Sequence, residues 1–318
     1  MEASEGRRTP FHSHFLQTAR VEPSRAYNSS EMCTLSVMRV AVVIPTCRRP
    51  DGLDACLSNL ARPDGLETDV IVVENGSSVG AEIAERHGVR YFNIGPASAA
   101  IARNFGIKEA GDVTAVALLD DDVIPSSGWL ERIVAPILAG QASATIGGVH
   151  VVTEASASPA ALGMFVDTST ALNPAKPFLA GLNMAIDPRV FEEVGGFRTE
   201  LGPGALGAGG EDILLGLMLT EAGYRIQAVL DAKVDHVIPS SRFTKEALEG
   251  RAFAGGQSSG WILYHWHGAR YRLLSLRVAK AWLEQLLPRN MSARLAAIER
   301  YGMLRQVQLE SGKPSVLR

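Results

Sequence analysis

The stretch AVALLDDD, residues 115–122, decides the fold, because five apolar residues are followed at once by three aspartates. An apolar run of this length indicates a buried strand of a parallel sheet. The carboxylates of Asp120, Asp121 and Asp122 then lie at the carboxyl end of that strand, the edge of an open α/β sheet where ligands bind. Because adjacent carboxylates repel one another, they favour a hard divalent cation, Mg²⁺ or Mn²⁺, as compensating charge. The alternative is a solvated acidic turn that caps the next helix.

Short apolar runs alternate with amphipathic segments on both sides of this stretch. We expect strands over residues 39–45, 69–73, 89–92, 115–119, 144–152, 180–186 and 225–230. We expect helices over residues 51–61, 80–87, 99–110, 129–138 and 212–222, and a mostly helical chain beyond residue 240. Such alternation predicts an α/β fold, with repeated βα units around a mostly parallel sheet.

The charge is unevenly divided along the 318 residues. The whole chain has 31 lysines and arginines against 34 aspartates and glutamates, a net charge of −3. Residues 240–318 alone hold 13 basic and 5 acidic side chains, which leaves an acidic body and a basic tail. An acidic body can bind a metal through its carboxylates, and a basic tail can bind an anionic surface or partner.

Cysteine content and hydropathy limit the class of protein. Three cysteines, all in the first third of the chain, are too few for a disulfide scaffold, so we expect a reducing, cytoplasmic setting. No stretch reaches the roughly 18 consecutive apolar residues of a membrane-spanning helix, so we expect a soluble protein. Residues 1–37 have neither periodicity nor the apolar core of a signal peptide, which predicts disorder.

Glu211 and Asp212 open an apolar helix directly after the glycine-rich segment LGPGALGAGG, residues 201–210. We expect that segment to be a mobile lid. A carboxylate that rigid structure holds at a pocket rim can act as a general base, and we assign this role to Asp212. A routine helix N-cap is the alternative.

Three further side chains can serve the same site. His236, at the end of a strand, can supply an imidazole to the metal, although a lone histidine is more often only packed or exposed. Arg48 and Arg103 can reach a nucleotide base or its phosphates. The chain has no G-x-x-x-x-G-K-[ST] loop, no G-x-G-x-x-G after the first strand and no C-x-x-C pair, which argues against a P-loop, a dinucleotide fold and structural zinc.

Six segments and one histidine carry a stronger signal: VAVVIPTCRRP (40–50), VIVVENGSS (70–78), ARNFGIKEA (102–110), LLDDDVIPSSGWLE (118–131), AGLNMAIDPRVFEEVGGF (180–197), GGEDILLGLMLTEAGYRI (209–226) and His236. In order and spacing they resemble the family 2 glycosyltransferases over residues 39–237. The resemblance implies one GT-A domain, a Rossmann-like mixed α/β sheet flanked by helices, which binds a nucleotide-sugar and a divalent metal and transfers the sugar with inversion. We therefore expect a GT-A domain over residues 38–240, followed by a basic helical extension over residues 241–318.

The resemblance also suggests which residues bind the nucleotide-sugar. By position, it places Pro45, Thr46 and Arg48 against the base and ribose. Glu74 matches the acidic residue that holds the base. Arg103 matches a basic residue near the base and the diphosphate.

The three aspartates match the D-x-D motif of the family. In the resemblance Asp122 is the direct metal ligand, while Asp120 lies nearer the ribose and belongs to the same metal site. Asp121 lies between them in the donor site. His236 matches the histidine that completes the metal coordination in many members.

Asp212 falls on the catalytic base of the family, with Glu211 beside it at the acceptor rim. The family often has a further acid and an arginine on this helix, where this chain has only apolar residues at positions 214, 215, 217 and 218. The Gln-x-x-Arg-Trp signature of processive members is also missing. We therefore expect a single sugar addition and not a polysaccharide synthase.

The expected function is a metal-dependent inverting glycosyltransferase. It moves one sugar from a UDP, dTDP or GDP donor to a hydroxyl or amine of a small-molecule or lipid-linked acceptor, with no nucleic-acid partner. One alternative is a nucleotidyltransferase that makes a nucleotide-sugar. Such an enzyme needs a loop rich in glycine and basic residues after the first strand to hold a triphosphate, and the segment PTCR (45–48) does not supply it. The other is a non-catalytic glycan- or nucleotide-binding module, against which both the triple aspartate and Glu211-Asp212 argue.

The basic tail lies outside the matched segments and carries three of the four tryptophans, Trp261, Trp266 and Trp282. It can close over the acceptor, form a dimer surface, or rest as a peripheral contact on an anionic membrane at the cytoplasmic face. A solvated helical appendage that packs its tryptophans on the core is an equal alternative.

Overall fold

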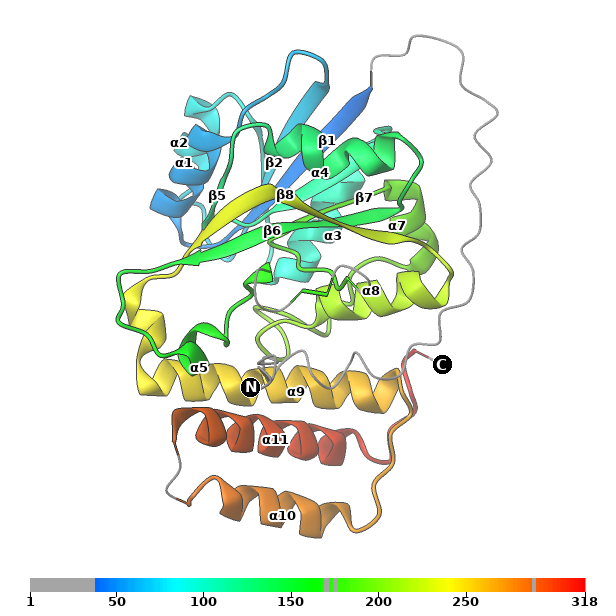
Figure 1. The fold of residues 1–318 in the computed structure, drawn as a ribbon. Helices are drawn as coiled ribbons and strands as arrows, with labels where there is room; N and C mark the ends of the chain where they lie inside the picture. The colour runs from blue at the N-terminus through cyan, green and yellow to red at the C-terminus, as the bar shows by residue number, and fades with distance from the viewer. Residues whose placement is uncertain (1–37, 169–171, 174–176, 288–289, 318) are drawn as a thin grey trace, which may run out of the picture.

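The computed structural model describes residues 38–168, 172–173, 177–287 and 290–317, so the expectation for residues 1–37 lies outside the described residues. Figure 1 shows an eight-stranded sheet with helices on both faces, and a layer of C-terminal helices beyond one side of it. This architecture confirms the mixed α/β fold with a C-terminal helical extension.

The sheet has the strand order β3-β2-β1-β4-β7-β6-β8-β5. Its strands are β1 (Arg39–Thr46), β2 (Glu67–Asn75), β3 (Arg90–Ile94), β4 (Ala115–Leu119), β5 (Val123–Pro125), β6 (Ala144–Val152), β7 (Asn183–Ile186) and β8 (Ile226–Val237). The first four are parallel, whereas β7 runs antiparallel between β4 and β6, and β5 pairs antiparallel with β8. The carboxyl ends of β1, β2 and β4 therefore lie at one edge of the sheet.

Helices cover both faces of this sheet. One face carries α1 (Pro50–Asn59), α2 (Ala81–Arg86) and α4 (Trp129–Leu138). The other carries α3 (Ala99–Glu109), α7 (Pro188–Val194) and α8 (Glu211–Glu221). Each face of the sheet packs against its helices in a hydrophobic core. Side chains alternate in direction along β1, so Val42 and Ile44 point into the core with α1, α2 and α4, and Ala41 and Val43 point into the core with α3, α7 and α8.

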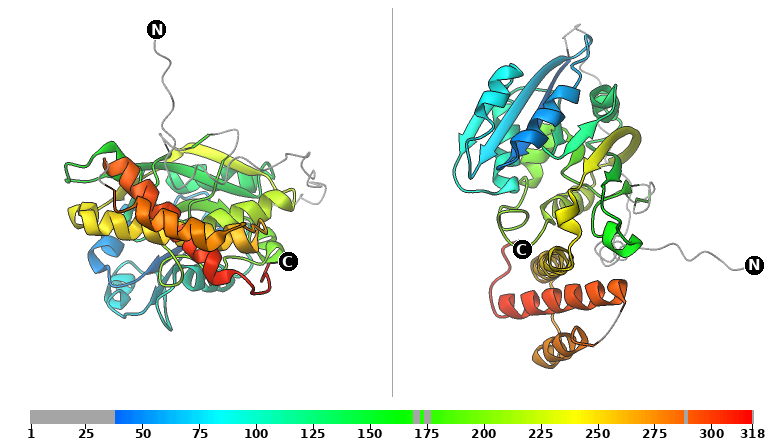
Figure 2. Two further views of the ribbon diagram at one scale, coloured as in Figure 1. Left: turned by 90° about the horizontal axis from the view of Figure 1, so that it is seen from below. Right: turned by 90° about the vertical axis from the view of Figure 1, so that its left-hand side faces the viewer.

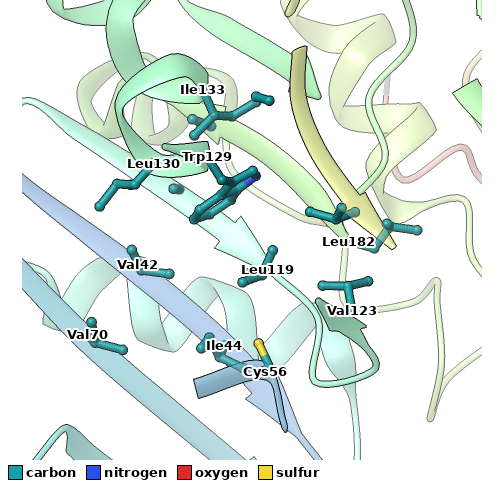
Figure 3. Close-up of a cluster of buried hydrophobic side chains, with 14 of the residues drawn as sticks. Val42, Ile44, Cys56, Val70, Leu119, Val123, Trp129, Leu130, Ile133 and Leu182 are labelled. Atoms are coloured by element: carbon teal, nitrogen blue, oxygen red, sulfur yellow. The ribbon is translucent and has the colours of Figure 1, made fainter. Parts of the chain in front are cut away.

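The first core is built around Trp129, as Figure 3 shows. The indole Nε1 of Trp129 donates to Asn183 Oδ1 at 2.8 Å, and the amide of Asn183 donates to the carbonyls of Gly148 and Ala232. These bonds join α4 to strands from three parts of the chain. They also satisfy the polar atoms that the core buries, which would otherwise destabilise it.

The C-terminal extension contains a 3₁₀ turn, η1 (Ser240–Phe243), and the helices α9 (Lys245–His265), α10 (Leu274–Glu284) and α11 (Met291–Glu310). Glycines bring α9 and α11 close together, and a Cβ added at Gly256 would lie only 2.1 Å from the Glu299 carbonyl oxygen. α10 packs on the far side of α11 and is the outermost layer (Figures 1 and 2). Over the part of the chain that the structure describes, no helix is long and apolar enough to cross a membrane.

Two features bear on the expectations for the extension and for the glycine-rich segment. Trp261 is buried at 5% exposure, but Trp282 is 47% exposed, so the extension does not pack all its tryptophans on the core. The glycine-rich segment 201–210 follows a defined course, with Leu201 fully buried and bridged to Leu206. The mobility expected for this segment stays a prediction.

Candidate active site

A pocket of about 500 Å³ lies at the carboxyl edge of the sheet, and β1, β2, α3, α8, β8, α9 and the aspartates directly after β4 all contribute to its wall. Most of the predicted site residues line it: Pro45, Thr46, Arg103, Asp120, Asp121, Asp122, Glu211, Asp212 and His236. The structure thus brings together residues that are widely separated in the sequence. Arg48 and Glu74 are not among the lining residues.

Arg103, on α3, lies buried between acids from two other elements. Its Nη1 donates to Glu211 Oε1 at 2.7 Å and its Nη2 to Asp120 Oδ1 at 2.6 Å. Burial alone would lower the pKa of Arg103, but the charges of Asp120 and Glu211 raise it. For Glu211, burial and the charge of Asp212 raise the pKa to about 7, despite the opposing effect of Arg103. The arginine therefore holds the end of β4 against the start of α8.

Asp121 points inward and is only 3% exposed. It accepts hydrogen bonds from Thr46 Oγ1 at 2.7 Å and from Arg49 Nη1 at 2.8 Å, one to each carboxylate oxygen. Burial raises its pKa to about 6, although Arg49 acts in the opposite direction. Because both oxygens are engaged, Asp121 ties the end of β1 to the end of β4.

Asp122 faces two basic side chains. Its Oδ2 accepts a hydrogen bond from Arg49 Nη1 at 2.7 Å, and its Oδ1 lies 3.6 Å from His236 Nε2. Burial raises the pKa of Asp122, but His236, Arg49 and Arg242 together outweigh burial and lower it to about 2. The carboxylate of Asp122 is therefore ionised at neutral pH.

The pair of Asp122 and His236 fits a divalent ion. Asp122 Oδ1 and His236 Nε2 lie 3.6 Å apart, which is too long for a good hydrogen bond. The separation is close to the roughly 3 Å between two neighbouring ligand atoms of an octahedral ion. Across the described residues, no group of three or more His, Cys, Asp or Glu side chains could hold a metal alone. Mg²⁺ and Mn²⁺ often take only one or two carboxylates and complete their coordination with substrate phosphates. The site therefore suits an ion that binds together with a phosphate-bearing substrate.

Asp212 lies in the first turn of α8 and lines the same pocket. It accepts hydrogen bonds from the backbone N–H of Gly181 at 3.0 Å and from that of Ile213 at 2.8 Å. Gly210 is the N-cap of α8, so the interpretation of Asp212 as a routine N-cap is wrong. In the described structure Asp212 forms no ion pair, in contrast to its neighbour Glu211.

Two cations enter the pocket from the C-terminal extension, Arg242 of η1 and Arg251 of α9. Arg251 Nε donates to the carbonyl of Met164 at 2.8 Å, and its guanidinium lies 4.7 Å from the ring centre of Phe165. Burial and the charge of Arg242 lower the pKa of Arg251 to about 10. No carboxylate of the described residues forms an ion pair with either arginine, so the pair favours an anion in the pocket.

Glu74 lies fully buried at the end of β2, beside the pocket. Its carboxylate accepts four hydrogen bonds, from Ser77 Oγ, Val79 N, Gly80 N and Tyr91 Oη. Three of these donors belong to the loop after β2, so Glu74 shapes that loop. Arg48 is bound to the same loop through Ser77 and Gly76. Contact of either residue with a base stays a prediction.

Sequence reasoning missed Arg49, Arg242 and Arg251. Arg49 directly follows Arg48, so the pair of arginines after the first strand was visible but its second member was not considered. The basic surplus beyond residue 240 was also visible. Its contribution to the pocket depends on how α9 packs, which no local pattern predicts.

Comparison with known proteins identifies the domain. Residues 41–195 match the family model described as Glycosyl transferase family 2. No curated protein sequence matches the chain significantly.

Solved structures share the fold at low sequence identity. The mannosyltransferase PcManGT from Pyrobaculum calidifontis, in complex with GDP-Man and Mn²⁺, is 18% identical, with a TM-score of 0.50 over 89% of this chain and 77% of that one. GalNAc-T7 with UDP, GalNAc and Mn²⁺ is 15% identical, with a TM-score of 0.54 over 89% of this chain and 59% of that one. TarS of S. aureus is 15% identical, with a TM-score of 0.50 over 85% of this chain and 54% of that one. This chain therefore spans less than two thirds of the last two, and the likeness is one of fold.

Proposed function

Because this chain belongs to the family 2 glycosyltransferases and has the GT-A fold, we propose that it transfers one sugar, with inversion, from a nucleotide-diphosphate sugar to an acceptor hydroxyl or amine. The observation that carries this proposal is the division of roles between two adjacent acids on α8. Glu211 is buried and paired with Arg103, whereas Asp212 faces the pocket without an ion pair among the described residues.

Asp212 acts as the general base. The acceptor oxygen or nitrogen attacks the anomeric carbon, and Asp212 takes its proton as the new bond forms. The bond from the anomeric carbon to the diphosphate oxygen breaks, and its electron pair leaves with the diphosphate. The two backbone N–H groups on Asp212 hold the carboxylate in place, which orients it for this transfer.

The leaving diphosphate needs positive charge at the moment of bond cleavage. Arg242 and Arg251 supply cations to the pocket, and neither forms an ion pair with a carboxylate of the described residues. Asp122 and His236 would hold Mg²⁺ or Mn²⁺, with Asp120 beside them, and such an ion would stabilise the negative charge of the diphosphate. Both PcManGT and GalNAc-T7 were solved with Mn²⁺ and a nucleotide or nucleotide-sugar, which supports a donor of this class.

A further wall of the pocket is available for the nucleoside end of the donor. Pro45 and Thr46 line it at the end of β1, and Asn75 and Ser98 line it at the end of β2 and the start of α3. Asn75 donates to the Ser98 carbonyl at 2.6 Å, so this wall is already ordered. We propose that the base and ribose bind here.

The decisive experiment separates donor binding from turnover. A thermal-shift screen of UDP-, dTDP- and GDP-sugars with Mn²⁺ first identifies the donor, because a bound ligand raises the melting temperature. Asp212→Asn should then keep that shift while release of the nucleoside diphosphate falls at least about 100-fold. The matched control is Asp187→Asn, which changes another aspartate at a helix start, outside the pocket. Near-normal turnover in Asp212→Asn would show that another group is the base.

A second measurement addresses the nucleotidyltransferase alternative. The wild-type protein is incubated with a sugar 1-phosphate and each nucleoside triphosphate. Absence of pyrophosphate release, together with turnover of a nucleotide-sugar, supports glycosyl transfer. Pyrophosphate release would overturn it in favour of the alternative.

A further inference from the structure

The outer side of α10 carries apolar side chains that the described chain leaves uncovered. Leu276 is 65% exposed and Leu283 is 57% exposed, whereas Ala281, on the side that packs on α11, is 2% exposed. At about 100° per residue, Ala281 lies roughly 140–160° around the helix from both leucines. Leu273 and Leu287, next to the two ends of α10, are 72% and 53% exposed. The helix is therefore apolar on two opposite faces, of which only one is covered.

Basic residues flank this exposed face. Arg272, Arg277 and Lys280 lie on α10 or directly before it, and over residues 270–287 the only acid is Glu284. Glu284 is already shared between Lys280 and Arg300, at 4.0 and 3.4 Å. Trp282 lies about 100° around the helix from Leu283, on a neighbouring flank, and is 47% exposed. Exposed leucines with a tryptophan and a surplus of cations are typical of helices that lie in a membrane interface.

Position in the fold makes this face accessible. α10 is separated from the sheet by α11 and α9, and the right view in Figure 2 shows it at the lower edge of the molecule. The face lies on the outermost element, so a flat surface can reach it along its whole length. The pocket, by contrast, is lined by α9 and elements of the sheet domain.

Charge decides between two kinds of occupant. In a symmetric contact with a second copy, the same patch meets itself, so Arg272, Arg277 and Lys280 of both copies would be brought together. An anionic lipid surface instead offers acyl chains to the leucines and phosphates to the cations. We propose that α10 and its flanking residues dock on an anionic lipid surface, with Leu276 and Leu283 at the boundary between headgroups and acyl chains. This proposal is independent of the reaction assigned to the pocket.

Vesicle binding by the full chain tests this proposal. Sedimentation with vesicles of 70% phosphatidylcholine and 30% phosphatidylglycerol should pull down the wild-type protein, and vesicles of phosphatidylcholine alone should bind it far less. Leu276→Glu/Leu283→Glu should weaken binding at least tenfold. Arg272→Gln/Lys280→Gln should weaken it about fivefold per cation removed, an effect that high salt also produces.

The control variant is Leu230→Glu, a similar change at a leucine of 37% exposure on β8, which should bind vesicles like the wild type. Unchanged circular dichroism and melting temperature show that each variant is folded. The proposal is overturned if the folded Leu276→Glu/Leu283→Glu variant binds the anionic vesicles as tightly as the wild type. It is equally overturned if the wild type does not bind vesicles and sedimentation equilibrium shows that the wild type is a dimer whereas the Leu276→Glu/Leu283→Glu variant is a monomer.

Discussion

The sheet edge and one residue of the C-terminal helical layer, Glu299, bury carboxylates in different ways. At the edge, Asp120, Asp121 and Glu211 each lie within 2.6–2.8 Å of an arginine that comes from another element. In the layer, Glu299 of α11 is 9% exposed, and no hydrogen bond or ion pair to its carboxylate occurs among the described residues. Burial alone raises the pKa of Glu299 to about 7. The buried acids of the edge are thus paired with arginines, whereas the packing around Glu299 in the layer buries an acid without a partner among the described residues and so favours its neutral form.

The largest effect should come from removing the central cation of the edge. Arg103→Met leaves Glu211 and Asp120 without their partner, and Glu211 is fully buried. Breaking a buried pair from one side typically lowers the free energy of unfolding by about 3–5 kcal/mol. Urea unfolding followed by circular dichroism measures this loss.

The matched control is Arg90→Met. Arg90 also contacts two acids, Asp69 at 2.6 Å and Glu109 at 3.7 Å, but its side chain is 43% exposed. We expect a loss of about 1 kcal/mol or less, because water screens surface pairs. Equal losses in the two variants would contradict the role assigned to buried charge at the edge.

The helical layer should respond to pH through Glu299. Its pKa is raised from 4.5 to about 7 on folding, so the folded state keeps the proton at pH values where the unfolded chain has lost it. The stabilising effect is therefore complete below about pH 4.5 and is lost as the pH rises through 7, by up to about 3 kcal/mol. The free energy of unfolding is measured at pH 5 and pH 8.

Glu299→Gln isolates this effect, since it removes one titrating group and leaves all others in place. The difference in unfolding free energy between wild type and variant should change by about 2.5 kcal/mol between the two pH values, because part of the effect is already lost at pH 5. A difference that is the same at both pH values would mean that Glu299 titrates normally, and that the layer does not hold a neutral acid.

Close packing in the same layer can be tested with two glycines of α9. In Gly256→Ala the new Cβ would lie 2.1 Å from the Glu299 carbonyl oxygen, so the two helices must move apart. We expect a loss of about 2–3 kcal/mol in unfolding free energy. Gly250→Ala, where nothing lies within 4 Å of the new Cβ, should instead stabilise the helix by about 1 kcal/mol. Loss of stability in both variants would show that the contact with α11 is not the cause.

The same contrast explains how far the sequence could predict the fold. β4 begins and ends where the apolar run predicts, because three charged residues stop it abruptly. α7 was not expected, since a helix of seven residues between a strand and a glycine pair has little periodicity. The antiparallel insertion of β7 between β4 and β6 depends on long-range pairing, which local hydropathy does not encode.

The site shows a similar limit. The residue types at Asp122, Asp212 and His236 suggested their chemistry, and the sheet edge brings them into one pocket. The arginines that bind the acids of the site could not be predicted, because Arg49 lies 72 residues from Asp121 and Arg103 lies 108 residues from Glu211 in the sequence. Glu74 is the opposite case, because its partners are close in sequence. The backbone N–H groups that bind it lie within six residues, yet hydrogen bonds between Glu74 and the loop that follows it were not considered from the sequence.

The smallest expected effect compares two hydroxyls with equal hydrogen-bond lengths. Thr46 donates to the buried Asp121 at 2.7 Å, and Thr220 donates to the carbonyl of Gly216 within α8, also at 2.7 Å. Thr46→Val removes a donor from a buried charged group, so we expect a loss of about 1–2 kcal/mol in unfolding free energy. Thr220→Val should change it by less than about 0.5 kcal/mol, because that carbonyl lies in a regular helix and the side chain is exposed. If urea unfolding gives the same small change for both, the hydrogen bond from Thr46 to Asp121 does not order the edge, and of the two side-chain contacts to Asp121 only that of Arg49 can do so.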